Sequence, residues 1–195
     1  MNDSVLRAIA PKVTRMIRMD HAHLMSVFHR YTADAPAHTR QALADRICIA
    51  LEIHAKLEEE VFYPALRELF PDGELVQKSV PEHQEMRRLI ARLRRMSVQH
   101  IGFDGVVLEL MRCFIHHMAD EETVLLPAAE RVLSEYLGEL GARMARRRLE
   151  LARPRAGAIA SSMVRAMPRS TLVMMAAAFG IGLLVAGLGR RRDDR

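Results

Sequence analysis

Two copies of one short pattern, H-x-x-x-E-E-x-x-x-x-P, occupy residues 54–64 and 117–127 of the 195-residue sequence. On a helix, a His and the Glu four residues later lie on one face, about 6 Å apart along the axis. An imidazole and a carboxylate at this spacing can bind the same metal ion. The candidate ligand pairs are His54 with Glu58 and His117 with Glu121.

An acidic residue followed by a His precedes each copy at nearly the same distance. His21 lies 33 residues before His54, and His83 lies 34 residues before His117. The sequence therefore contains two tandem units, each with an acid–His pair followed by H-x-x-x-E-E. Burying four imidazoles and two carboxylates without partners would be very costly, and a pair of metal ions removes that cost. The six candidate metal ligands are His21, His54, Glu58, His83, His117 and Glu121.

The elements that must position these ligands are predicted to be helices. Ala, Leu, Arg, Glu and Met dominate the first 137 residues, and no alternating run rich in Val, Ile and Thr indicates a strand. Apolar residues and candidate ligands recur at three- and four-residue steps, which places them on one face of each helix. The expected helices cover residues 11–31, 36–69, 74–97 and 106–136. Their short connections predict an all-α, antiparallel up-down four-helix bundle.

A donor set of imidazoles and carboxylates suits iron, with manganese as a substitute, better than structural zinc. Two such ions bridged by carboxylates lie about 3.5–4 Å apart in known two-metal sites, and positions remain open for a small ligand. Glu59 and Glu122 lie about 100° further round their helices, so we expect them to hydrogen-bond to ligands rather than to bind metal. The spacing alone leaves ligation by Glu59, Glu122 or His116 open.

These residues resemble the hemerythrin-like, or HHE cation-binding, domains over about residues 12–136. The resemblance implies an antiparallel four-helix bundle with a non-haem di-iron centre that meets O2, NO or peroxide. Oxygen-carrying hemerythrins place a second His one turn after the first on their third helix, and Arg87 stands at that position here. This departure favours a sensor or a di-iron oxidase over a reversible oxygen carrier.

The chain changes character after residue 137. Residues 1–137 hold 17 Lys and Arg against 20 Asp and Glu, whereas residues 138–195 hold 12 Arg against 4 acidic residues. Residues 170–189 are uncharged, and 20 helical residues span about 30 Å, one hydrocarbon core. We expect four parts: a hemerythrin-like metal-binding domain (1–137), an Arg-rich juxtamembrane helix and linker (138–169), a C-terminal transmembrane helix (170–189) and a short basic tail (190–195).

The expected location is the cytoplasmic (inner) membrane, crossed once, with the domain in the cytoplasm because Arg-rich loops stay inside. The bilayer is thus an expected partner, and the small residues of 170–189 would let two such helices pair into a homo-oligomer. Nucleic acid is not an expected partner, because aromatic residues for base stacking do not accompany the Arg clusters.

The function expected from this pattern is a membrane-anchored di-iron protein that binds or senses O2, NO or reactive oxygen species. We expect a metal- and ligand-binding protein rather than an enzyme. The rivals are a di-iron oxidase or peroxidase, and a structural membrane protein whose metal stabilises the bundle.

Overall fold

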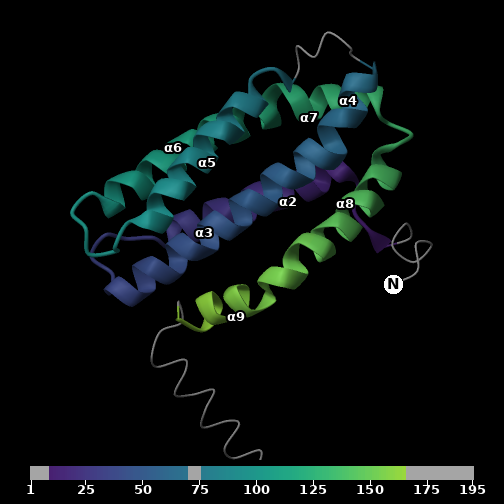
Figure 1. The fold of residues 1–195 in the computed structure, drawn as a ribbon. Helices are drawn as coiled ribbons and strands as arrows, with labels where there is room; N and C mark the ends of the chain where they lie inside the picture. The colour runs from purple at the N-terminus through teal and green to yellow at the C-terminus, as the bar shows by residue number, and fades with distance from the viewer. Residues whose placement is uncertain (1–8, 70–75, 166–195) are drawn as a thin grey trace, which may run out of the picture.

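The computed structural model describes residues 9–69 and 76–165, and within these ranges all regular structure is helical (Figure 1). This confirms the all-α class. The helices are α2 (Val13–His29), α3 (Ala37–Leu57), η1 (Glu58–Phe62), α4 (Tyr63–Leu69), α5 (Ser79–Arg95), α6 (Phe103–Asp120), η3 (Glu121–Leu125), α7 (Leu126–Val132), α8 (Leu137–Ala152), η4 (Arg153–Arg155) and α9 (Ala156–Arg165).

Four arms make up the expected bundle. α2 and α5 are single helices. α3–η1–α4 and α6–η3–α7 are each one unbroken helical rod that contains a single wider turn. α2 packs beside α3, and α5 packs beside α6 (Figure 1). Short connections join the paired arms, as the sequence predicted.

The wider turns η1 and η3 are π-helical and begin at the duplicated glutamates. The Tyr63 N–H donates to the Glu58 carbonyl, and the Leu126 N–H donates to the Glu121 carbonyl, both across five residues. A proline follows each turn, at Pro64 and Pro127. Proline lacks an N–H and its ring clashes with the carbonyl four residues earlier in a regular helix, so a wider turn accommodates it. Such turns are frequent at functional sites.

A fifth arm, α8 (Leu137–Ala152) to α9 (Ala156–Arg165), lies along the bundle, where the sequence predicted an Arg-rich juxtamembrane helix and linker. α8 packs on α2 and α3, and α9 packs on α3 (Figure 1). α8 buries Leu137, Leu140 and Met144 at three- and four-residue steps, a pattern that the many Arg residues obscured in the sequence. No helix of the described ranges is long and apolar enough to cross a membrane. The expected membrane segment 170–189 lies outside those ranges.

The apolar core consists of two clusters with a polar layer between them. One cluster is built around Leu24, Leu51 and Phe114, and the other around Ile17, Phe62 and α8. The candidate ligands lie between these clusters, so both sides of the polar layer are closed by tightly packed apolar side chains.

We expect Gly141→Ala to weaken the docking of α8. A Cβ at this position would lie 2.0 Å from the carbonyl oxygen of Pro11, so the backbone segments must separate. The free energy of unfolding should fall by about 1–3 kcal/mol, as for other overpacked sites, measured by urea denaturation.

Gly138→Ala is the matched control on the same helix, because a Cβ there meets nothing within 4 Å. It should leave stability unchanged or raise it by up to about 1 kcal/mol through helix propensity. Equal effects of the two substitutions would contradict the close approach at Gly141.

Candidate metal centre

All six candidate ligands meet in the polar layer, and each is at most 1 % exposed. They come from all four arms of the bundle, with two ligands from each rod that carries a π-helical turn. The arms supply His21 from α2, His54 and Glu58 from α3–η1, His83 from α5, and His117 and Glu121 from α6–η3.

The four imidazoles form two pairs. The ring centroids of His21 and His54 lie 5.0 Å apart, and those of His83 and His117 lie 4.6 Å apart. Each pair comes from one tandem unit. It joins the His of the acid–His pair to the His of the H-x-x-x-E-E pattern. The centre therefore has two imidazole halves of the same composition.

The two carboxylates lie between these halves. Each faces one imidazole of either pair, with an oxygen 3.2–3.5 Å from the ring nitrogens: Glu58 faces His54 and His83, and Glu121 faces His21 and His117. Each carboxylate can therefore bind a metal ion together with imidazoles of both pairs.

Several buried polar atoms of this cluster have no hydrogen-bond partner within the described part of the chain. They are His21 Nε2, both ring nitrogens of His54, Glu58 Oε1 and Glu121 Oε2. Leaving such atoms unpaired costs about 1–3 kcal/mol each. Donor atoms of His21, His54, Glu58, His117 and Glu121 all lie within 4.8 Å of one another, so a cation among them would satisfy these groups. The residues present thus fit a metal that prefers nitrogen and oxygen donors.

A second ring of carboxylates orients the imidazoles from outside. In three cases a carboxylate oxygen lies 2.9–3.1 Å from the Nδ1 atom: Glu122 with His21, Glu59 with His83, and Glu82 with His117. An Nδ1–H that donates to a carboxylate leaves the Nε2 lone pair directed at the centre and makes it more basic. In this geometry Glu59 and Glu122 hydrogen-bond to imidazoles from outside the cluster. Glu82 does the same, although the sequence interpretation gave it no such role.

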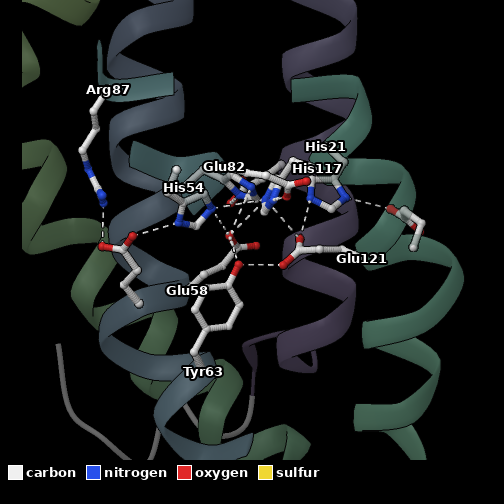
Figure 2. Close-up of polar contacts among 12 residues, drawn as sticks. His21, His54, Glu58, Tyr63, Glu82, Arg87, His117 and Glu121 are labelled. Carbon is white, nitrogen blue, oxygen red and sulfur yellow. Dashed lines mark hydrogen bonds and ion pairs between the residues drawn. The ribbon is translucent and has the colours of Figure 1, made fainter. Parts of the chain in front are cut away.

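Two neighbouring side chains lie away from the centre. His116 is exposed on the outer face of α6. Arg87 donates to Glu59 at 2.5 Å, at the outer edge of the cluster (Figure 2). Arg87 thus supports an outer carboxylate from the position at which the oxygen carriers have a further His.

The electrostatics of the cluster favour bound positive charge. Burial disfavours the charge of Glu58, but His54, His117 and His83 outweigh burial and hold the pKa of Glu58 well below its usual range. Burial also disfavours protonation of His117, yet Glu121 and Glu58 raise the pKa of His117 to about 10. A metal that binds here must displace protons from the imidazoles.

Tyr63 is part of this cluster, although the sequence interpretation gave it no place among the candidate site residues. Its buried hydroxyl donates to Glu121 Oε1 at 2.8 Å and lies 3.2 Å from Glu58 Oε2, so it points at both carboxylates (Figure 2). Burial and the two carboxylates raise the pKa of Tyr63 well above its usual value. Tyr63 follows Glu58 by five residues, a spacing that the π-helical turn brings into line with the site. The same place in the second unit holds Leu126.

The chain is similar to several known proteins. The family model described as the hemerythrin HHE cation binding domain matches residues 12–129. A DNA nickase from Nostoc is 30 % identical over 119 residues, which are 61 % of this chain but only 34 % of that protein. An uncharacterised hemerythrin-like protein from Schizosaccharomyces pombe is 27 % identical over 140 residues, 69 % of each protein.

A solved structure shares the fold. It is a crystal structure of a hemerythrin HHE cation binding domain-containing protein from Mycobacterium kansasii, with a TM-score of 0.66 and 22 % identity. The match covers 80 % of this chain and 99 % of that one.

We expect Tyr63→Phe to lower the free energy of unfolding by about 1–3 kcal/mol, because it leaves two buried carboxylates without this donor. Urea denaturation of the purified protein measures the change. Tyr136→Phe is the control, since Tyr136 is 57 % exposed and its substitution should change stability by less than about 0.5 kcal/mol. A Tyr63 variant as stable as the control would mean that the hydroxyl is not needed by the carboxylates.

Proposed function

The chain belongs to the hemerythrin HHE cation-binding family, and from that premise we propose that it is a non-haem di-iron protein that binds or senses O2, NO or reactive oxygen species. The observation that carries the proposal is the pairing of four imidazoles around two shared carboxylates. Manganese suits the same donors. The proposed ligands are His21, His54, Glu58, His83, His117 and Glu121.

The number of donors supports a role in binding small molecules. Two imidazoles for each ion plus shared carboxylates leave coordination incomplete. Arg87 stands where a further His would add an imidazole, and its guanidinium is paired with Glu59 instead. When bound, an iron pair supplies open positions for a diatomic ligand or peroxide. The protein orients the rings through the outer carboxylates. It also excludes water with apolar side chains such as Phe114, whose ring contacts the rings of His21 and His54.

A di-iron oxidase or peroxidase is the second candidate, and Tyr63 is the observation that favours it. Its hydroxyl is a buried hydrogen-bond donor 2.8 Å from Glu121, from which it would orient a shared carboxylate while oxygen or peroxide is reduced. Stopped-flow spectroscopy separates the two functions. A binding or sensing protein should change its iron spectrum once per equivalent of O2 or NO, whereas an enzyme should consume O2 or peroxide repeatedly while reductant lasts. An iron spectrum unaffected by all three would favour a purely structural metal.

We expect the Glu58→Ala/Glu121→Ala double variant to lose both metal ions, because both shared carboxylates are removed. Metal content of the purified protein, measured by elemental mass spectrometry, should fall from about two ions per chain to none. Glu68→Ala/Glu135→Ala is the control, since both residues are exposed, and it should keep its metal. Full metal content in the Glu58/Glu121 variant would reject the assignment.

We expect His83→Ala to lose metal and His116→Ala to retain it, although both remove one His. His83 is fully buried, with Nε2 3.2 Å from Glu58 Oε2, whereas His116 is exposed. The same elemental measurement reports both. Equal losses would place His116 among the ligands.

We further propose that residues 170–189 attach the protein to the cytoplasmic membrane, with the bundle in the cytoplasm. The support is the uncharged sequence of that segment and the Arg residues on either side of it. The full chain should sediment with membranes and need detergent for release. A chain ending at Arg165 keeps α8 and α9, and it should be recovered with its metal without detergent. Full-length protein in the detergent-free supernatant would reject the anchor.

A further inference from the structure

Three of the four imidazoles have an outer carboxylate within hydrogen-bond distance of Nδ1, and the fourth does not. His21, His83 and His117 each have a carboxylate oxygen within 3.1 Å of Nδ1. The corresponding atom of His54 lies 3.9 Å from Asp20 Oδ2, and within the described part of the chain it has no hydrogen-bond partner. The His21–His54 half of the centre therefore lacks one of the hydrogen bonds that orient the imidazoles of the other half.

The tandem repeat shows what is missing at His54. Asp20 precedes His21 as Glu82 precedes His83, and Glu82 reaches the Nδ1 atom of His117 at 3.1 Å. Asp20 is the residue equivalent to Glu82 and faces His54 in the same way. Its side chain is one methylene shorter, so the gap has one cause in the sequence itself.

The second cause comes from the fifth arm. Both carboxylate oxygens of Asp20 accept hydrogen bonds from Arg148 of α8, at 2.5 Å from Nη1 and 2.6 Å from Nη2. The pair is two-pronged, and the Asp20 side chain is only 14 % exposed; charge-assisted bonds of this geometry are among the strongest in proteins. Arg148 therefore competes with the His54 Nδ1–H for the same oxygens.

The position of Arg148 is fixed independently of the metal centre. Gly141 brings α8 against Pro11, and Leu140 and Met144 are buried in the apolar cluster beside it. A cavity of about 390 Å³ borders both Asp20 and Arg148, so the Asp20 carboxylate has space to change its orientation when Arg148 is removed.

We propose that Arg148 holds Asp20 away from His54 and thereby makes the His21–His54 half the weaker of the two metal positions. The proposal rests on the two-metal function proposed above. Loss of an outer partner of a metal-binding His costs typically 10- to 100-fold in metal affinity. Arg148 is a positioning residue that acts through Asp20, and by linkage metal binding in this half and the Arg148–Asp20 contact oppose each other. The C-terminal arm is thus coupled to the metal centre.

The test is anaerobic competition between the full-length protein and a chelator for iron(II). The protein should bind two ions with unequal affinities. Arg148→Ala should tighten the weaker position by about tenfold and leave the stronger one unchanged. Arg147→Ala is the matched control on the same helix, because Arg147 pairs with Glu60 and Glu150 instead, and it should change neither affinity.

Two further variants show that Arg148 acts through Asp20. Asp20→Glu restores the missing methylene with Arg148 in place, and it should also tighten the weaker position. The Asp20→Ala/Arg148→Ala double variant should lose the gain of Arg148→Ala. Asp20→Glu also keeps the test decisive if Arg148→Ala loosens α8, which circular dichroism and thermal unfolding would report.

The proposal is overturned if Arg148→Ala and Asp20→Glu leave the weaker affinity unchanged, or if either loosens it. Looser binding would mean that Arg148 holds Asp20 toward His54. Failure of the proposed function gives a different result, because the unmodified protein would then bind fewer than two ions.

Discussion

The structure depends on one electrostatic constraint: two carboxylates and four imidazoles are buried together between two apolar clusters. Such groups can be buried only with compensating charge and hydrogen bonds. The carboxylates draw positive charge into the centre, as the high pKa of His117 shows. Each of the first four arms contributes at least one of these side chains, so those arms must be in register for the centre to form. The apolar clusters on either side keep water from relieving the constraint.

The two tandem units meet this constraint in nearly the same way. Each supplies an acid–His pair and an H-x-x-x-E-E rod, and each rod widens into a π-helical turn at its ligand Glu. The departures from symmetry are where the two halves become chemically different. Leu126 occupies the position in the second unit that Tyr63 occupies in the first, and Glu82 occupies the position equivalent to Asp20. The contact of Arg148 with Asp20 adds a third difference from outside the repeat.

The sequence predicted the four arms and the shared faces of the His and Glu residues because both follow from spacing along single helices. A His and a Glu four residues apart share a face wherever the helix lies, and the duplicated pattern supported the choice. The outer partners could not be predicted in this way. Glu82 approaches His117, and Asp20 approaches His54, only through the packing of one helix on another. Tyr63 reaches the site because a π-helical turn replaces the 3.6-residue period on which the sequence prediction depended. A helix was expected after residue 137, but its packing on the bundle was not, because Arg residues surround its apolar stripe of Leu137, Leu140 and Met144.

We propose that this cluster holds two metal ions, one for each imidazole pair. Anomalous X-ray scattering from crystals of protein expressed in iron-containing medium tests it most directly. Data collected on both sides of the iron absorption edge should show two peaks. One peak should lie beside His21 and His54 and the other beside His83 and His117, with Glu58 and Glu121 between them. A single peak, or none at the cluster, would show that the cluster does not hold a pair of metal ions.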